Sequence, residues 1–331
     1  MKNTISINAE RSIGVIILAA GEGKRMHSDL PKVLHPICGK PLLWYVKETA
    51  KNIKSAKVVA VVSKNREKIE SCIEDKTIEF VIQFPPRGTG DAVLKAEEAL
   101  KDFDGLVIVL CGDVPLIKEE TLRKLIDYHL SKKASATILT TILPDAGAYG
   151  RIVRKGERVV KIVESVDANE KEKKINEINS GIYVFDKEEL FSALHKINPS
   201  NAQKEYYLTD TIEIIQKKGL AVYGFAASDW QEVMGINNRK ELTERELILQ
   251  KRIIEKMQLK GVTIKNPSNT RIDWDVEIGE NTIIETGVEL LGQTFIGKNC
   301  ILGRNAKIID SKISDGSEIG EDSNIEDAEL L

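Results

Sequence analysis

The chain has 331 residues, of which 42% are apolar and 30% charged, and its formal net charge is -3. This is the composition of a globular protein, and the length is suited to about two domains. The slightly negative charge gives no general attraction to nucleic acid or to an anionic membrane, so a phosphate-bearing partner needs a local cationic pocket.

The cysteines and apolar segments do not indicate secretion, a zinc site or membrane insertion. The four cysteines are far apart and form no Cys-x-x-Cys pair, which argues against a disulfide framework and a zinc site. Residues 1–12 lack the apolar core of a signal peptide. No apolar run approaches the roughly 20 residues of a membrane span. The cytoplasm is therefore the expected location.

From Val15 to about Ala227, short apolar runs alternate with stretches whose apolar residues have helical spacing. This alternation predicts an α/β domain with a mostly parallel sheet and helices on both faces. The expected strands are Val15–Ala20, Lys57–Val62, Ile78–Gln83, Leu106–Cys111, Ala136–Ile142 and Gly181–Phe185. The expected helices include Leu42–Lys51, Ala92–Leu100 and Lys118–Leu130. Ligands of such sheets bind beyond the carboxyl ends of the strands.

The first expected strand runs into a loop with two glycines and two cations, Gly21-Glu22-Gly23-Lys24-Arg25, and Lys32 adds a third cation after Pro31. A glycine-rich loop lets backbone N–H groups approach an anion, and the cations add positive charge beside it. The loop lacks the third glycine of a dinucleotide fingerprint and the Gly-Lys-Ser/Thr ending of a Walker loop. It predicts phosphate binding of another kind, with an ordinary strand–helix turn as the alternative.

Two further strands lead into polar residues. Leu106–Cys111 is followed by Asp113, whose carboxylate is suited to a hard cation such as Mg²⁺, with helix capping as the alternative role. Ile78–Gln83 leads into the turn Arg87-Gly88-Thr89-Gly90. Two glycine turns in one sheet suggest that a nucleotide lies between them.

Farther along, short polar segments between apolar residues offer hydrogen-bond donors and acceptors that suit a sugar. They include Gly150, Glu164, Asn179 and Thr209. Taken singly, each is explained as a turn or a satisfied polar group. The four histidines have no metal-ligand spacing, and no Gly-x-Ser-x-Gly or other nucleophile motif is present.

The last third of the chain has a different pattern. Asn238 with Glu241 predicts a capped helix over about 238–260, and the residues that follow repeat every six positions. Aliphatic residues lie at Ile278, Ile284, Leu290, Ile296, Leu302 and Ile308, and after one five-residue step at Ile313, Ile319 and Ile325. Such hexapeptide repeats are typical of a β-helix, and here they predict about three coils. So short a solenoid favours association with other copies.

Several segments occur in a fixed order between Val15 and about Leu247: LAAGEGKRM, HSDLPKVLHPICGKPLL, QFPPRGTGDAVLKA, CGDVPLI, AYGRIV, IVE, EINSGIYVFD, EYYLTD and VMGINNR. In this the chain resembles the bacterial bifunctional N-acetylglucosamine-1-phosphate uridyltransferase and glucosamine-1-phosphate acetyltransferase family. The resemblance implies a Rossmann-like nucleotidyltransferase domain over 1–237, a linker helix over 238–260 and a short left-handed β-helix over 261–331. It also implies a homotrimer.

The activity implied by this resemblance is Mg²⁺-dependent uridylyl transfer from UTP to N-acetylglucosamine 1-phosphate. It makes UDP-N-acetylglucosamine and pyrophosphate, for cell-wall peptidoglycan precursors. The sugar phosphate oxygen attacks the α-phosphorus of UTP in line and pyrophosphate leaves. This chemistry needs cations and positioning rather than a protein nucleophile, so the lack of a catalytic histidine is no objection.

The resemblance also assigns roles to residues of this sequence. Arg25 and Lys32 would bind phosphate and stabilise charge in the transition state, and Asp113 and Asn237 would hold Mg²⁺. The nucleotide would be bound by Leu18, Ala20, Gly21, Gln83, Gly88 and Thr89. The sugar phosphate would be bound by Gly150, Glu164, Asn179 and Thr209.

The chain departs from the family pattern in three ways. Pro86 stands in place of a usual glutamine and Cys111 in place of a usual aromatic residue, both near the base or the sugar. No histidine follows position 195 and few coils remain, so we expect no acetyl transfer. One alternative function is transfer to another sugar 1-phosphate or from dTTP. Another is a catalytically silent regulatory or assembly subunit, which the presence of the full set Arg25, Lys32, Asp113 and Asn237 argues against.

Overall fold

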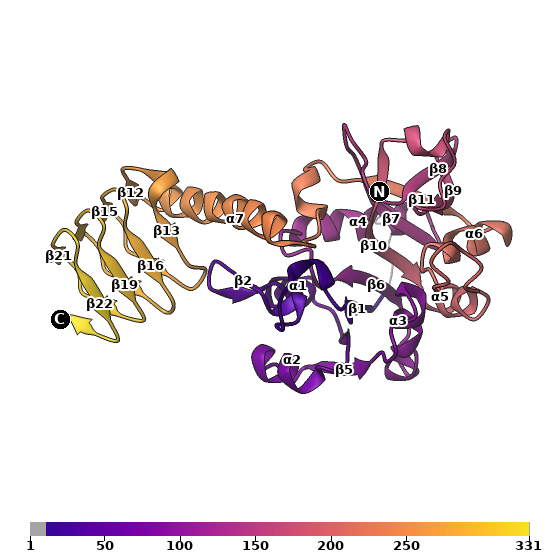
Figure 1. Ribbon diagram of the computed structural model, residues 1–331, viewed down its shortest axis with the longest axis horizontal. Coiled ribbons are helices and arrows are strands. Elements are labelled where there is room, and N and C mark those ends of the chain that lie inside the picture. The colour runs from indigo at the N-terminus through magenta and orange to yellow at the C-terminus, as the bar shows by residue number, and fades with distance from the viewer. Residues whose placement is uncertain (1–10, 331) are drawn as a thin grey trace, which may run out of the picture. The chain divides into compact units, whose positions relative to one another are not determined.

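The computed structural model describes residues 11–330 and divides them into two compact units (Figure 1). The first unit holds residues 11–34 and Leu42–Asn237, and the second holds His35–Pro41 and residues 238–330. Within residues 11–330, no helix is both long enough and apolar enough to cross a membrane.

A nine-stranded sheet in the order β5-β4-β1-β6-β10-β7-β11-β9-β8 is the centre of the first unit. Its strands are β1 (Ile13–Ala19), β4 (Lys57–Val62), β5 (Ile78–Ile82), β6 (Leu106–Cys111), β7 (Ala136–Ile142), β8 (Arg151–Lys155), β9 (Arg158–Val163), β10 (Glu177–Asp186) and β11 (Val222–Ala226). All six expected strands are present. Five differ by at most two residues at either end, whereas the expected strand Gly181–Phe185 is only the second half of β10, which begins at Glu177.

The predicted parallel pairing is confirmed for β5, β4, β1 and β6. It is wrong for much of the other half, where β10 is antiparallel to both β6 and β7 and β8 is antiparallel to β9. A turn as short as Gly156-Glu157, between β8 and β9, can join only antiparallel strands, because parallel neighbours need a long crossover.

Helices cover both faces of this sheet (Figure 1). One core lies under α1 (Leu42–Asn52), α2 (Arg66–Ile73) and α4 (Glu119–Ser131), and the other under α3 (Thr89–Lys95), α5 (Lys187–Leu194) and α6 (Asp210–Lys217). Successive residues of a strand point to opposite faces, so Val15 and Ile17 join the first core and Ile16 joins the second. This explains why β1 is apolar throughout.

The expected helices α1 and α4 are confirmed to within one or two residues. The expected helix Ala92–Leu100 differs: α3 begins at Thr89 and ends at Lys95, and a separate 3₁₀ turn, η3, covers Glu98–Leu100. Two further 3₁₀ turns, η1 (Lys24–Met26) and η2 (Lys32–Leu34), carry the cations that follow β1.

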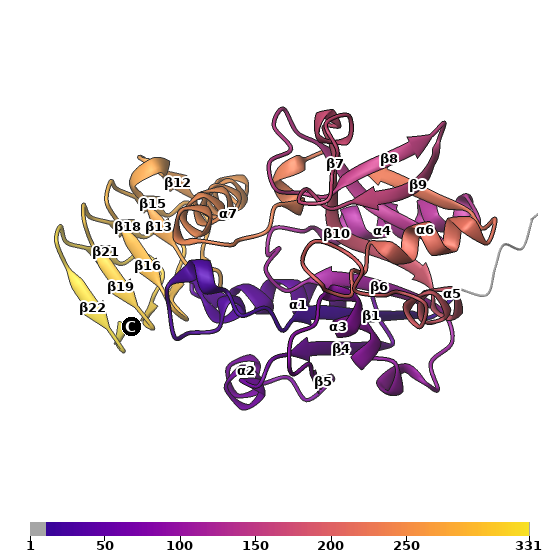
Figure 2. The same cartoon turned by 45° about the vertical axis from the view of Figure 1, so that its right-hand side comes forward.

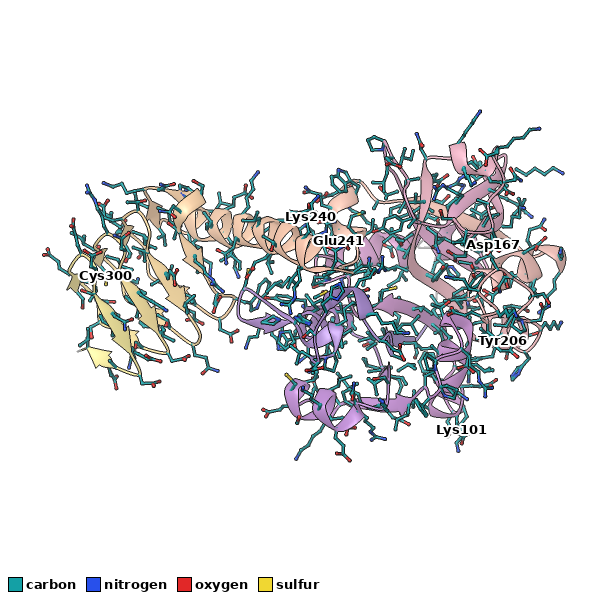
Figure 3. All side chains as sticks on the ribbon, in the orientation of Figure 1. Lys101, Asp167, Tyr206, Lys240, Glu241 and Cys300 are labelled. Carbon is teal, nitrogen blue, oxygen red and sulfur yellow. The ribbon has the colours of Figure 1, made fainter. Side chains whose placement is uncertain are left out.

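The larger segment of the second unit, residues 238–330, begins with the long helix α7 (Arg239–Leu259). Asn238 caps it as predicted: its Oδ1 accepts from Glu241 N–H at 2.9 Å, and its Nδ2 donates to Glu241 Oε1 at 2.6 Å. Figure 3 labels Glu241 at this end of α7 and Cys300 among the strands that follow.

Twelve short strands follow α7 and form three parallel, four-stranded sheets, ordered β12-β15-β18-β21, β13-β16-β19-β22 and β14-β17-β20-β23 (Figure 2). Their bounds are β12 (Thr263–Ile264), β13 (Arg271–Ile272), β14 (Glu277–Ile278), β15 (Ile283–Ile284), β16 (Glu289–Leu291), β17 (Phe295–Ile296), β18 (Ile301–Leu302), β19 (Lys307–Ile309), β20 (Lys312–Ile313), β21 (Glu318–Ile319), β22 (Asn324–Glu326) and β23 (Glu329–Leu330). This arrangement fits a β-helix.

The hexad positions face the interior of this second unit, and eight of the nine predicted aliphatic side chains are buried. The partner of Glu289 is Lys307, whereas the partner of Phe295 is Lys312, so one turn after β19 is a residue shorter. The five-residue step in the repeat is therefore a turn between β19 and β20 that is one residue shorter.

The prediction of about three coils was too low, since each sheet has four strands. The first coil was missed because its buried residues, Ile264 and Ile272, are not six positions apart. A 3₁₀ turn, η6 (Pro267–Asn269), lies between them and breaks the period.

The predicted first domain, 1–237, differs from the structure in one segment. The hairpin of β2 (Pro36–Ile37) and β3 (Lys40–Pro41) belongs to the second unit. There Cys38 N–H donates to Glu246 Oε1 at 3.1 Å, and Trp274 N–H donates to the Cys38 carbonyl at 2.9 Å. These bonds join residues more than 200 positions apart, which no local pattern reveals.

Candidate active site

A cavity of about 610 Å³ lies in the first unit at the carboxyl end of β1. Its walls come from the loop after β1, the start of η2, the segment between β5 and α3, and the end of β6. The lining includes every residue predicted to bind nucleotide, phosphate or metal: Leu18, Ala20, Gly21, Arg25, Lys32, Gln83, Gly88, Thr89, Asp113 and Asn237. The expected position at the strand ends is confirmed.

Two side-chain oxygens and two cations meet in this cavity. Lys32 forms an ion pair with Asp113, and its Nζ lies 3.5 Å from Asn237 Oδ1. Arg25 Nη2 donates to the same Asn237 oxygen at 3.0 Å. The Lys32 and Asp113 side chains are mostly buried, so the charges interact with little screening by water.

The Asp113 and Asn237 side-chain oxygens are suited to a Mg²⁺ ion that also binds oxygens of a ligand. They do not by themselves form a complete set of metal ligands. A carboxylate and an amide oxygen are hard ligands, and both contact one cationic nitrogen, Lys32 Nζ. Among residues 11–330 there is no group of three or more His, Cys, Asp or Glu side chains placed to hold a metal ion. Mg²⁺ commonly takes one or two protein ligands and completes its shell with phosphate oxygens and water.

Two glycines are required by the backbone around the cavity. Gly23 has φ +62°, and a Cβ there would lie 2.7 Å from Lys32 Cβ. Gly88 has φ +108°, and a Cβ there would lie 2.6 Å from the Tyr206 carbonyl oxygen. A side chain at either position would push the loop away from its neighbour, so both glycines shape the walls.

The residues predicted to bind sugar phosphate form a second cluster, which is not part of the cavity lining. Thr209 Oγ1 donates to Glu164 Oε1 at 3.0 Å, and Asn179 N–H donates to the Gly150 carbonyl at 2.9 Å. Burial raises the pKa of Glu164, and the hydrogen bond from Thr209 partly offsets this rise.

The Asn179 side chain is already used inside the protein. Its Nδ2 donates to the Tyr183 hydroxyl at 2.7 Å, and its Oδ1 accepts from Gly181 N–H at 3.1 Å. Cys111 joins this cluster to the cavity: it lines the cavity, and its Sγ lies 3.4 Å from the Gly181 carbonyl oxygen. Burial raises the pKa of the Cys111 thiol to about 12, so the thiol is neutral.

Thr89 has a structural contact that its predicted role does not include. Its hydroxyl oxygen accepts from Leu208 N–H at 3.0 Å and ties the start of α3 to the segment before α6. Glu205 and Pro86 also line the cavity. Sequence reasoning assigned no role to Glu205, although it opens the EYYLTD segment, and treated Pro86 only as a departure from a pattern.

Comparison with known proteins shows the family of the chain. Residues 14–238 match the family model described as nucleotidyl transferase. The bifunctional protein GlmU of Caldanaerobacter subterraneus subsp. tengcongensis is 46% identical over 305 residues, which cover 92% of this chain and 66% of that protein. The bifunctional protein GlmU of Listeria innocua is 43% identical over 322 residues, which cover 92% of this chain and 70% of that protein. The chain thus spans about two thirds of the length of these relatives.

Solved structures share the fold at low sequence identity. A UDP-glucose pyrophosphorylase complexed with UDP-glucose has a TM-score of 0.60 at 18% identity and covers 73% of this chain and 99% of its own. A putative glucose-1-phosphate thymidylyltransferase from Bacillus anthracis has a TM-score of 0.60 at 19% identity and covers 72% and 95%. These likenesses concern the fold alone.

Proposed function

Because the chain belongs to the nucleotidyl transferase family and, within it, to the family of the bifunctional GlmU proteins, we propose that it transfers a uridylyl group from UTP to N-acetylglucosamine 1-phosphate. The products are UDP-N-acetylglucosamine and pyrophosphate. One observation carries the proposal: Arg25, Lys32, Asp113 and Asn237 meet in one cavity that Gln83 and Gly88 also line. The supply of cell-wall precursors in the cytoplasm is part of this proposal.

The reaction uses positioned charge rather than a protein nucleophile. Lys32 and Arg25 bind the phosphates of UTP and stabilise the negative charge that spreads over them in the transition state. Asp113 and Asn237 would hold Mg²⁺, which supplies further neutralisation of phosphate charge. A phosphate monoester is itself an adequate nucleophile, so the protein needs only to place it in line with the leaving pyrophosphate.

The second cluster would bind the sugar phosphate. The Glu164 carboxylate is suited to accept a hydrogen bond from a sugar hydroxyl, and Thr209 fixes its orientation. The repeats of residues 261–330 would form a left-handed β-helix, α7 would serve as the linker, and the chain would form a homotrimer.

A second candidate is transfer to another sugar 1-phosphate, or transfer from dTTP. It is favoured by two residues that depart from the family pattern, Pro86 and Cys111, because both line the cavity. This alternative keeps the reaction and changes only the substrate.

Pyrophosphate release tests the proposal. The protein is given UTP or dTTP with N-acetylglucosamine 1-phosphate, glucosamine 1-phosphate or glucose 1-phosphate, each with Mg²⁺ and with a chelator instead. We expect release with the acetylated sugar and none in the chelator. Release mainly with another sugar would support the second candidate. Silence with every sugar and with both nucleotides would contradict both and favour a regulatory subunit.

A further inference from the structure

We propose that Asp91 sets the base specificity of the cavity by holding the Gln83 amide in one orientation, with its carbonyl oxygen toward the nucleobase. The inference rests on the proposed nucleotide transfer for its substrate. It concerns a residue that does not line the cavity and would act only through Gln83.

Gln83 lies just after β5 and is 4% exposed. Its Nε2 donates to two oxygens, the Gly88 carbonyl at 2.9 Å and Asp91 Oδ2 at 2.7 Å. Neither oxygen can donate a hydrogen bond, so the reversed amide would put three acceptors together. The nitrogen of Gln83 is therefore fixed on the side of Asp91, and both amide hydrogens are used.

The carbonyl oxygen of Gln83 remains for a ligand. No hydrogen bond within residues 11–330 uses it, and it is not one of the fully buried side-chain atoms without a partner. Since the side chain lines the cavity, this oxygen is open to it. A nucleobase placed there meets one fixed acceptor.

The backbone adds hydrogen-bond donors to the same cavity. The N–H groups of Gly21 and Gly88 donate to no residue that the structure describes, and both glycines line the same cavity. Uracil and thymine present an N3–H between two carbonyl oxygens, which is complementary to an acceptor flanked by donors. Cytosine has an unprotonated N3, which would face the Gln83 oxygen acceptor to acceptor. The site therefore selects uracil or thymine nucleotides over cytosine nucleotides.

Asp91 is needed because the Gly88 carbonyl satisfies only one of the two amide hydrogens. Without the Asp91 carboxylate, a buried N–H group of Gln83 loses its partner, and the amide gains freedom to rotate. Asp91 belongs to the first turn of α3, its side chain is 12% exposed, and Lys95 Nζ lies 3.9 Å from its other carboxylate oxygen. It is a positioning residue.

The test compares Asp91→Leu with Asp91→Asn, using Lys95→Ala as a control that removes the nearby charge. The measured quantity is the ratio of kcat/KM for UTP to that for CTP, with the same sugar phosphate and Mg²⁺. Asp91→Leu should lower this ratio by roughly ten-fold or more, mainly through loss with UTP. Asp91→Asn should keep the ratio, because its amide oxygen still accepts from Gln83. Lys95→Ala should also keep it.

A double variant separates positioning from a general effect on folding. In a Gln83→Leu background, Asp91→Leu should change the UTP to CTP ratio no further. A further change there, or an unchanged ratio in a well-folded Asp91→Leu protein, would overturn the proposal. If Asp91→Leu does not fold, Asp91→Ala takes its place with the same expectations.

Calorimetry of UMP and CMP binding involves no turnover. It therefore tests the role of Asp91 independently of the proposed transferase activity. Preference for UMP that is lost in Asp91→Leu and retained in Asp91→Asn would support the role of Asp91 even if no pyrophosphate is released. Equal binding of UMP and CMP by the unaltered protein would contradict it even if the transferase is active.

Discussion

Lys32 contacts both oxygens that we propose as metal ligands. These contacts determine the effect that we expect on kcat and KM when Lys32 is replaced. Its Nζ pairs with Asp113 and lies 3.5 Å from Asn237 Oδ1, in a mostly buried position. A lysine at this position can stabilise the additional negative charge that the phosphates carry in the transition state. A residue that only binds substrate would stabilise the bound substrate and the transition state equally.

We therefore predict that Lys32→Ala lowers kcat more than it raises KM for UTP. The loss of kcat should be of the order of 100-fold or more, as for other fixed charges in a buried site. Steady-state kinetics checks this, with Lys64→Ala, outside the cavity lining, as the control. An effect on KM alone would make Lys32 a plain binding residue.

Glu164 gives the candidate sugar site its own pH dependence. Burial raises its pKa, so the carboxylate becomes protonated at a higher pH than an exposed glutamate would. The ionised form accepts hydrogen bonds from a sugar, and the protonated form does so less well. KM for the sugar phosphate should therefore rise as the pH falls through this raised pKa.

The measurement is KM for the sugar phosphate from about pH 4 to about pH 8, a range that begins near the ordinary pKa of a glutamate. Glu164→Gln should raise KM at all pH values and leave only the pH dependence that comes from the substrate phosphate, whose second pKa is about 6. KM for UTP serves as the internal control. The assignment fails if the variant keeps the same pH profile as the unaltered protein.

The residues of the cavity were predictable to different degrees. The loop after β1 and Asp113 were found because glycines, cations and a carboxylate directly follow apolar runs. Asp91 gave no such signal, since an acidic residue in the first turn of a helix is ordinary. Its role depends on Gln83, eight residues away, and on which way an amide points.

At the scale of elements, the stacked parallel strands of the second unit depend on glycines that follow buried aliphatic residues. Gly297 follows Ile296 in β17, and a Cβ there would lie 2.5 Å from Asp315 N on the next coil. Gly320 follows Ile319 in β21 in the same hexad position, but a Cβ there would meet only the Ser323 hydroxyl at 3.5 Å.

We predict that Gly297→Ala lowers the stability of the second unit by about 1–3 kcal/mol, because the neighbouring backbone has to move. Gly320→Ala is the matched control and should change stability by less than about 0.5 kcal/mol. Chemical denaturation followed by circular dichroism measures both. Equal effects of the two substitutions would show that the distance to the next coil does not determine the loss of stability.

The elements themselves were predictable where one local pattern dominates. The hexad repeat marks eight buried aliphatic positions from Ile278 to Ile319, and the alternation of strands and helices marks β1, β4, β5, β6 and β7. The antiparallel half of the sheet was missed because strand direction depends on partners distant in sequence, such as β6 and β10. Burial on both faces makes such strands look alike in sequence.

At the scale of the whole molecule, the units were harder to predict than the elements. The hairpin His35–Pro41 lies within the first 50 residues but belongs to the second unit, through Cys38 and its partners Glu246 and Trp274. A division of the chain into consecutive domains cannot assign an early segment to the later unit.

The β-helix also bears on the number of copies. Outward-facing Phe295 and Ile301 are 41% and 40% exposed, apolar side chains on the outside of coils whose interior is already filled. A short solenoid with exposed apolar residues gains stability when copies cover one another. These residues therefore give a physical reason to expect association between copies, whereas the number three is implied only by the resemblance.

Light scattering at micromolar concentration should give about three times the 36.9 kDa mass of one chain. The double substitution Phe295→Lys with Ile301→Lys should lower this mass, because charged side chains do not pack against an apolar partner surface. Ile142→Lys is the matched control, since Ile142 is 66% exposed but belongs to the first unit. A monomer mass for the unaltered chain would contradict the trimer. A trimer that survives the double substitution would place the interface on another face of the coils.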